Sequence, residues 1–414
     1  MDTAVFEEYE SQVRSYCRTW PTVFAKAKGS IMTDTDGRRY IDFFAGAGAL
    51  NYGHNPDLIK RRLIEYLESD SILHSLDMYT PPKAAFIEAF ETRILQPRGF
   101  TYKVMFPAPT GTNAIEAALK LARKVTKRTG VFAFMGCFHG MTLGSLALTS
   151  DLGSRAGGAV PLGNVTHIPA PYQFGDDFAL TYLRTLLTDD HSGVEKPAAI
   201  VLETVQAEGG VYVFSPEFLR GLAALAAEFG ILTIVDDIQV GCSRTGTFFS
   251  FERAGITPDI VCLSKSLGGY GLPFAVTLFK PELDIWAPGE HNGTFRGNQL
   301  AMVAATAGVE LTCEHGIEAG VATREKLVAD FLASEVAPLG EDLAIRGIGL
   351  IWGIDVGDEA TATAVARGCF ERGLVLERAG RHNSVVKLMP SLVIEEDLLT
   401  EGLGIVRDAI AATR

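Results

Sequence analysis

The stretch Asp259-Ile-Val-Cys-Leu-Ser-Lys265-Ser-Leu-Gly-Gly269 places a lysine directly after a short apolar segment. Residues 259–263 follow a proline and have the apolar character of a buried strand. Lys265 comes just past the carboxyl end of this strand, before a glycine-rich turn. A buried ammonium group is costly unless it is paired, neutralised or used covalently. The alternative is a lysine that leads from the strand into a solvated loop, and the stretch alone does not decide between the two.

Strand-like and helix-like segments alternate on both sides of this stretch. The segment 112–125 carries Ile115, Leu119, Ala122 and Val125 at helical spacing, and a second helix is expected over 216–228. Such alternation predicts an α/β fold with a mostly parallel sheet flanked by helices. Ligands in these sheets bind outside the carboxyl ends of the strands. The expected strands are 103–106, 131–135, 198–202, 231–235 and 260–263.

The two ends of the chain have a different pattern. The segment 29–52 predicts a hairpin, with Asp36-Gly37 as its turn. After residue 305 the pattern becomes helix, strand (349–355), helix, strand (384–388) and helix. We therefore expect a large domain over 56–305 and a smaller α/β domain over 306–414. The N-terminal segment 1–55 is expected to join the smaller domain.

Composition limits the classes of function. A chain of 414 residues with 47% hydrophobic residues is long enough for two domains. The net charge of -13 argues against a nucleic-acid surface and favours small-molecule partners. Residues 1–10 lack the pattern of a signal peptide, and no apolar run has the length of a membrane span. The six cysteines show neither CxxC pairs nor metal-ligand spacing. A cytoplasmic protein with reduced thiols, no metal site and no membrane partner is expected.

Asp236 ends the apolar strand that precedes the lysine strand. A carboxylate at a strand end can bind a metal or cap a helix, and these alternatives stay open for the residue alone. It can also keep a pyridine nitrogen protonated, while an amine such as Lys265 condenses with an aldehyde. Together these two chemistries suit pyridoxal 5'-phosphate. Gln239 could then hydrogen-bond the phenolic oxygen of the ring.

A phosphate and an aromatic ring need further partners. Thr110-Gly111-Thr112 forms a strand-to-helix junction, where backbone amides and hydroxyls make an anion site. An ordinary helix N-cap explains the same residues. Phe138 follows the strand 131–135 and could stack on the ring, although a core position is the common fate of a single phenylalanine.

The order of the motifs resembles that of the class III aminotransferases, within the fold-type I pyridoxal-phosphate enzymes. The resemblance covers nearly the whole chain. It implies a large domain with a mostly parallel seven-stranded sheet and a smaller α/β domain from the N- and C-terminal segments. The motifs that carry it are Thr110-Gly-Thr112, Phe138-His-Gly140, Glu203-Thr-Val-Gln-Ala-Glu208, Asp236-Asp-Ile-Gln239, Gly241-Cys-Ser-Arg-Thr-Gly246, Ser264-Lys-Ser266 and Thr294-Phe-Arg-Gly-Asn298.

The resemblance implies a role for each cofactor-binding residue. Lys265 becomes the Schiff-base lysine and proton shuttle, Asp236 the partner of the ring nitrogen, and Gln239 the partner of the phenolic oxygen. Thr110, Gly111 and Thr112 hold the phosphate, and Phe138 stacks on the ring. Thr294 reaches the phosphate of the neighbouring subunit's cofactor, so a homodimer or a higher homo-oligomer is expected.

The substrate side departs from the family pattern. Glu208 matches the glutamate that faces the substrate cavity, which a basic residue of the C-terminal domain usually neutralises. Lys387 stands where the family commonly has an arginine, and a lysine cannot form a bidentate fork to a carboxylate. Arg296 stands where glycine is commoner, so it is a candidate carboxylate binder or, equally, a surface or interface arginine.

Longer stretches narrow the subgroup. Residues 41–55, 109–114, 138–144 and 289–298 are similar to those of the diaminobutyrate–2-oxoglutarate aminotransferases, including the enzymes of ectoine biosynthesis. The resemblance implies ping-pong transfer of an amino group between glutamate and aspartate 4-semialdehyde, which gives L-2,4-diaminobutyrate. Another ω-aminotransferase (acetylornithine, ornithine or 4-aminobutyrate type), a related aminomutase and a non-catalytic cofactor-binding protein are the alternatives.

Overall fold

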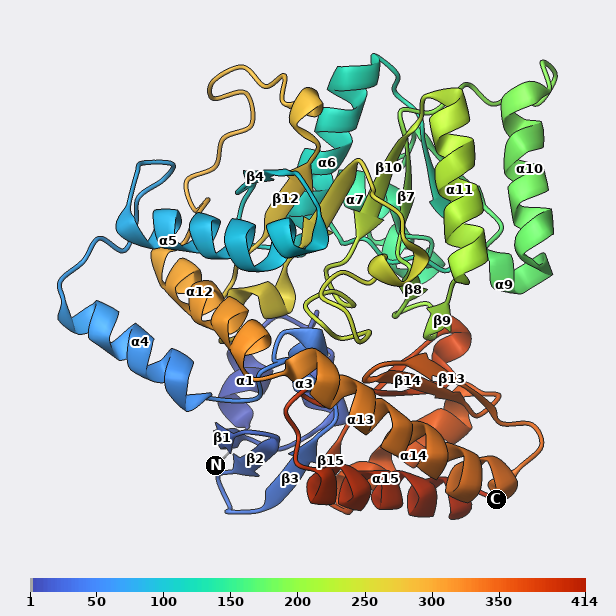
Figure 1. The fold of residues 1–414 in the computed structure, drawn as a ribbon. Helices are drawn as coiled ribbons and strands as arrows, with labels where there is room; N and C mark the ends of the chain where they lie inside the picture. The colour runs from blue at the N-terminus through green and yellow to red at the C-terminus, as the bar shows by residue number, and fades with distance from the viewer. Residues whose placement is uncertain (1–2) are drawn as a thin grey trace.

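A seven-stranded sheet forms the centre of the computed structural model, which describes residues 3–414 (Figure 1). The first two residues of the predicted N-terminal segment, Met1 and Asp2, lie outside the described residues. Pairing is parallel from β11 through β10, β7 and β5 to β6, whereas β12 runs antiparallel to both β11 and β4. The predicted α/β fold with a mostly parallel sheet is therefore confirmed. In spatial order the strands are β4 (Lys103–Met105), β12 (Val276–Phe279), β11 (Ile260–Leu263), β10 (Leu232–Asp236), β7 (Ala199–Leu202), β5 (Val131–Phe134) and β6 (Val165–Ile168).

Both faces of this sheet are buried, as the continuous apolar runs of its strands require. Successive residues of β10 and β11 point to opposite faces, so Ile234 and Ile260 contribute to one core cluster and Val235 and Val261 to the other. The helix α6 (Gly111–Thr126) covers the first face with an apolar stripe. Helices α5 (Pro81–Phe90) and α11 (Pro216–Phe229) cover the second face.

Two central strands were not predicted. β6 (Val165–Ile168) and β12 (Val276–Phe279) are only four residues long, and each contains a threonine, so neither shows a clear period. The predicted helices over 112–125 and 216–228 are confirmed by α6 and α11. Pro216 occupies the first turn of α11, and the Ser215 side chain caps that turn. The helix ends at Gly230, which has a left-handed conformation.

A second, antiparallel sheet follows in the C-terminal third of the chain. Its order is β13 (Ala344–Ile348), β14 (Ile351–Asp355), β17 (Val385–Leu388) and β16 (Glu377–Ala379). The predicted strands 349–355 and 384–388 correspond to β14 and β17, whereas β13 and β16 were not predicted. Helices α13 (Ile317–Phe331), α14 (Glu359–Glu371) and α15 (Glu396–Ala411) share a core with this sheet.

The N-terminal strands lie beside this C-terminal region (Figure 1). The predicted hairpin is present as β2 (Ile31–Asp34) and β3 (Arg39–Asp42), and Gly37 has the positive φ that its turn needs. β1 (Phe24–Lys28) pairs with β2, and β15 (Leu374–Val375) pairs in parallel with β3. The division into 1–55, 56–305 and 306–414 stays a prediction, and α12 (Gln299–Glu314) carries the chain past residue 305 as one helix.

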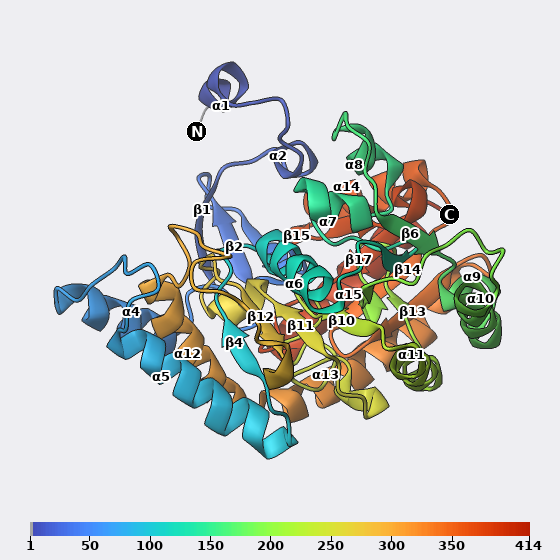
Figure 2. The same cartoon turned by 90° about the horizontal axis from the view of Figure 1, so that it is seen from above.

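The remaining elements are short, apart from α4 and α10. Seen from above, α1 lies apart from the rest of the molecule (Figure 2). Among residues 3–414, no helix combines the length and the apolar character needed to span a bilayer. These elements are α1 (Ala4–Tyr9), α2 (Tyr16–Thr19), α3 (Ala45–Gly48), α4 (Asp57–Glu68), α7 (Leu143–Leu148), α8 (Leu152–Ala156), α9 (Pro171–Phe174), α10 (Asp176–Thr188), β8 (Val205–Gln206) and β9 (Tyr212–Val213).

Candidate active site

A cavity of about 160 Å³ lies outside the carboxyl ends of the central strands. This is where ligands of open α/β sheets bind. The residues that line it follow β4, β5, β7, β10 and β11. Seven of the predicted site residues are among them, namely Gly111, Thr112, Phe138, Glu208, Asp236, Gln239 and Lys265.

Lys265 begins the short 3₁₀ turn that follows β11, with a φ of 48°. A lysine in the left-handed region is strained, so the surrounding structure must hold it there. Its Nζ donates a hydrogen bond to the carbonyl of Ala47 at 2.8 Å. Burial lowers the pKa of Lys265. Lys265 is therefore uncharged in a larger fraction of the molecules than an ordinary lysine, and the uncharged amine is the form that attacks an aldehyde.

The partner of Lys265 comes from an unusual turn. Residues 45–48 form a left-handed turn, in which Ala45 has a φ of 46° and Ala47 a φ of 54°. The turn aims the Ala47 carbonyl at both Lys265 and Gln239, whose Nε2 donates to it at 2.9 Å. Two alanines in this region are costly. We infer that the contacts of this carbonyl hold the turn in place.

Asp236 is buried at the end of β10 and pairs with a histidine that the sequence did not assign a role. Its Oδ2 lies 2.7 Å from Nδ1 of His139, and its Oδ1 accepts the backbone N–H of Ile238 at 3.1 Å. Burial alone lowers the pKa of His139, but Cys137 and Asp236 outweigh burial and raise it well above the usual value. The contact with His139 holds the Asp236 carboxylate in place at the edge of the cavity.

Two further buried acids hold the loops around the cavity. Asp237 accepts hydrogen bonds from the backbone N–H and the hydroxyl of Ser250. Glu203 accepts the backbone N–H of Phe138 at 2.9 Å. Burial raises the pKa of each of these two acids to about 7.

At the start of α6, the side chains are already engaged. The backbone N–H and the hydroxyl of Thr110 both donate to Oδ1 of Asn113, at 3.2 and 2.7 Å. The hydroxyl of Thr112 is hydrogen-bonded to Thr142 at 2.7 Å. The Thr110 hydroxyl thus bonds to the Asn113 side chain, the first backbone N–H groups of α6 can form an anion site, and the phosphate roles of Thr110, Gly111 and Thr112 stay predictions. A Cβ on Gly111 would lie 2.9 Å from the Ile238 side chain, so only glycine fits without a shift.

Glu208 lines the cavity, and behind it lie Lys387 and Glu377; we term these three residues the distal end. Oε1 of Glu208 accepts hydrogen bonds from Lys387 at 2.7 Å and from Nε2 of Gln239 at 3.0 Å. Lys387 Nζ also lies 2.8 Å from Oε1 of Glu377. The Lys387 side chain is fully buried. Glu377 was not predicted, because its proximity follows from the register between β16 and β17.

These charges shift one another's ionisation. Burial alone raises the pKa of Glu208, but Lys387 and Lys265 outweigh burial and lower it to about 2. Burial also disfavours the charged form of Lys387, but Glu208 and Glu377 outweigh it and raise the pKa of Lys387. Burial raises the pKa of Glu377, and Lys387 partly offsets this. Lys387 is therefore a cation shared between two carboxylates.

Thr294 and Arg296 do not line this cavity. They lie in a loop beside a second cavity of about 170 Å³, together with residues 73–76 and Pro109. Arg296 donates from Nη1 to the His291 carbonyl at 3.0 Å and to Oδ1 of Asn292 at 3.2 Å, so it stabilises its own loop. The prediction for Thr294 concerns a neighbouring subunit, and both roles stay predictions.

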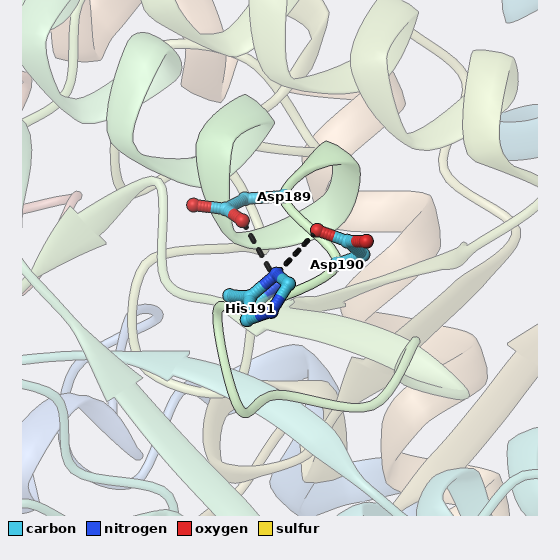
Figure 3. A group of neighbouring side chains, drawn as sticks. All are labelled: Asp189, Asp190 and His191. Carbon is cyan, nitrogen blue, oxygen red and sulfur yellow. Dashed lines mark hydrogen bonds and ion pairs between the residues drawn. The ribbon is translucent and has the colours of Figure 1, made fainter.

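One exposed cluster has the residue types of a metal site (Figure 3). Asp189, Asp190 and His191 lie on the turn after α10. The His191 backbone N–H donates to Asp189 at 2.9 Å, and its Nδ1 lies 2.7 Å from Oδ1 of Asp190. These contacts are those of a local turn. All three side chains are exposed, whereas the residues that line the cavity are buried or half-buried.

The cavity fits the cofactor that the sequence suggested. Lys265 would meet the aldehyde, Asp236 the ring nitrogen, Phe138 a ring face, and the first N–H groups of α6 the phosphate. Oε1 of Gln239 is buried without a hydrogen-bond partner among the described residues, so a polar molecule in the cavity would satisfy it. When it is bound, pyridoxal phosphate supplies a ring that accepts electrons from the reacting carbon.

Comparisons of sequence support this chemistry. The family profile described as Aminotransferase class-III matches residues 14–410. The diaminobutyrate–2-oxoglutarate transaminase of Streptomyces coelicolor is 52% identical over 418 residues, which cover 100% of this chain and 98% of the relative. The protein of the same name from Halalkalibacterium halodurans is 51% identical over 413 residues, with 99% and 97% covered.

Solved structures agree with the fold. The ornithine aminotransferase of Toxoplasma gondii, described with pyridoxal phosphate at its active site, has a TM-score of 0.86 and 25% identity, and the match covers 99% of this chain and 93% of that one. An aminotransferase of Bacillus anthracis has a TM-score of 0.88 at 24% identity, with 99% and 97% covered. The chain is thus a member of the class III aminotransferases, the pyridoxal-phosphate-dependent transaminases to which its motifs, fold and cavity point.

Proposed function

We propose that the protein transfers an amino group between L-glutamate and L-aspartate 4-semialdehyde, giving 2-oxoglutarate and L-2,4-diaminobutyrate. The relatives that are about half identical over their full length carry the name of this activity. The observation that supports it in the structure is the pairing of a cofactor site with a distal end that presents both charges. Lys387 can meet a carboxylate, and Glu208 can meet an ammonium group.

Each residue of the site has its own role in the proposed reaction. Lys265 would hold the aldehyde of the cofactor, and its amine is the group placed to move a proton at the reacting carbon. Asp236, which His139 holds in place, would lie against the ring nitrogen and hold a proton there. The first N–H groups of α6 would hold the phosphate and so orient the bound cofactor.

The two substrates suit the distal end. Glutamate carries a second carboxylate at the end remote from its reacting carbon. Diaminobutyrate reacts at its 4-amino group, so its remote end carries an ammonium and a carboxylate. A site with only a cation would suit glutamate but repel the ammonium of the diamino acid. A site in which Lys387 and Glu208 lie in contact can meet both.

A donor panel tests the proposal. The purified holoenzyme is assayed with 2-oxoglutarate as acceptor and with 2,4-diaminobutyrate, ornithine, acetylornithine or 4-aminobutyrate as donor. We expect the highest kcat/KM with 2,4-diaminobutyrate. A clear preference for one of the other three would assign the protein to a different ω-aminotransferase. Turnover of an amino aldehyde without any oxo acid would identify an aminomutase.

We also propose a homodimer in which Thr294 acts across the interface. Co-expression of Lys265→Ala and Thr294→Ala subunits tests this, because a hybrid dimer holds one site with both residues intact only if Thr294 comes from the partner. Activity restored in the mixture, and absent in each variant alone, is the expected result. A cytoplasmic location and a role in ectoine biosynthesis are further parts of the proposal. Neighbouring genes for an acetyltransferase and a cyclising synthase would support the pathway.

A further inference from the structure

We propose that Glu377 is a specificity-determining positioning residue, which selects amino donors that carry a second ammonium group. This inference rests on the proposed function and deepens it. Glu377 acts through Lys387, which it holds in place and partly neutralises. Glu208 is then left with enough negative charge to bind the remote ammonium of a diamino acid.

The two partners of Lys387 are held in different ways. Glu377 and Lys387 are direct cross-strand partners in the antiparallel pair of β16 and β17. Their side chains therefore point to the same face, and their contact is part of the sheet itself. Glu208 comes from the loop between β8 and β9, in a different part of the chain. Glu208 can therefore change partners while Glu377 keeps Lys387 in position.

The charges of the distal end do not balance. Glu208 and Glu377 supply two carboxylates, and Lys387 supplies one ammonium in contact with both. The nearby Tyr16 stays neutral, because burial and the two carboxylates raise its pKa to about 12. Gln239 is neutral, and Lys265 is committed to the cofactor in the loaded enzyme. Two carboxyl groups thus face a single lysine, which favours a cationic group on the substrate.

Without Glu377 the balance would change. Lys387 would have Glu208 as its only anionic partner, and the two charges would cancel. The remote ammonium of a diamino acid would then compete with Lys387 for Glu208. A donor without that ammonium would lose nothing, because its remote carboxylate needs only Lys387. The effect of removing Glu377 therefore depends on the donor, which a purely structural role does not explain.

The sharpest test uses two donors that differ by one group. 2,4-Diaminobutyrate and 4-aminobutyrate share the reacting amine and the remote carboxylate, but only the first has the second ammonium. We expect the wild-type holoenzyme to prefer 2,4-diaminobutyrate. In Glu377→Gln, the ratio of the two kcat/KM values should fall roughly tenfold, mainly through a higher KM for 2,4-diaminobutyrate. The KM for glutamate should change less than about threefold.

Controls separate specificity from damage. Glu359→Gln removes the carboxylate that lies 3.5 Å from Arg378, the residue next to Glu377, and should leave the ratio unchanged. Glu377→Asp keeps the charge and should keep most of the preference. The visible spectrum of the bound cofactor and the Tm report whether each variant is folded and loaded.

Each outcome has a definite meaning. A ratio that is unchanged in Glu377→Gln overturns the inference and leaves the proposed function standing. Equal losses with both donors overturn it as well, because they indicate a structural role. Collapse of the ratio in a folded, loaded Glu377→Asp also contradicts it. A wild-type enzyme that uses 4-aminobutyrate as well as 2,4-diaminobutyrate overturns the proposed function, and the inference with it.

Discussion

At the cofactor end of the cavity, every predicted residue follows a strand of one sheet, whereas the distal end combines a loop of the central region with two strands of the C-terminal sheet. Asp236 and Lys265 follow the neighbouring parallel strands β10 and β11. Lys387 reaches Glu208 across 179 positions of sequence. The residues proposed to hold the cofactor thus follow strands of one sheet, and those proposed to distinguish substrates lie where this region meets the C-terminal sheet.

The comparison also separates two kinds of electrostatics. At the cofactor end, the carboxylate of Asp236 pairs with the imidazole of His139 and with no other ionisable side chain among residues 3–414. At the distal end, one ammonium is shared by two carboxylates. A balanced pair favours one protonation state, which chemistry needs. An unbalanced group leaves a charge for a substrate, which selectivity needs.

Lys265→Ala should have the largest effect of any change at the cofactor end. It removes both the amine that bonds the aldehyde and the group that moves the proton, so turnover should fall by at least roughly 10⁴-fold. The absorbance of the lysine-bound cofactor should also disappear. Steady-state rates and visible spectra measure the two effects. Lys326→Ala, at an exposed lysine that pairs with Asp330, should change neither. Near wild-type cycling by Lys265→Ala would show that another group is the nucleophile.

Asp236→Asn should have the next largest effect. The amide can keep the contacts with His139 and with the Ile238 N–H, but it carries no charge, so the ring nitrogen is no longer held protonated. We expect kcat to fall roughly 10²–10³-fold with the cofactor still bound. The pKa of His139 should also fall, which NMR titration can follow. A kcat within a few fold of wild type would remove Asp236 from the catalytic role.

Lys387→Met tests the distal end. The KM for glutamate should rise roughly 10–100-fold, because no cation is left for its remote carboxylate. Buried Glu377 and half-buried Glu208 also lose their shared partner, so the free energy of unfolding should fall by about 3 kcal/mol. The cofactor spectrum should stay as in the wild type, which distinguishes this end from the other. Loss of the cofactor in this variant would contradict the separation of the two ends.

Asp237→Asn should give the smallest effect, visible only in the dependence of stability on pH. The pKa of Asp237 is raised by burial to about 7 in the folded protein, so the folded state binds a proton that the unfolded state releases near pH 4. The stabilisation is complete below about pH 4 and is lost as the pH rises towards 7. The variant should therefore gain stability relative to wild type between pH 5 and 8, measured by denaturant unfolding.

The Asp237→Asn experiment needs a folded variant and a control at an exposed site. Asn can still accept the Ser250 N–H and can donate to the Ser250 hydroxyl, so the variant should fold. Asp284→Asn, at an exposed position, should follow the wild-type profile at every pH. Parallel profiles for wild type and Asp237→Asn would show that this acid does not carry the proton.

The cofactor end could be predicted because each of its residues lies next to a recognisable strand in the sequence. Each follows an apolar strand, and parallel strands bring their carboxyl ends to one edge, so Lys265, Asp236 and Phe138 could be placed together without knowing any side-chain contact. The pairing of His139 with Asp236 could not be predicted, because it depends on how the loop after β5 crosses β10. The left-handed turn at residues 45–48 was also missed, since alanine rarely adopts a positive φ.

The distal end was predictable only in part. Glu208 and Lys387 were found through a resemblance, but Glu377 has no motif of its own. Its position follows from the register of β16 against β17, and β16 is three residues long with mixed character. β6 and β12 are no shorter than predicted strands such as β5 and β7, but each carries a threonine within its apolar run, which weakens the signal of a buried strand.

The contact between Glu208 and Lys387 has a consequence for the lifetime of the protein. It joins a loop of the central region to the C-terminal sheet, and a substrate bound there as proposed would touch both. Ligands that bind only the folded state stabilise it, by about 2.7 kcal/mol at a concentration a hundred times the Kd. Cells that are rich in glutamate would thus protect this chain against proteolysis, and starvation for its own substrate would shorten its survival.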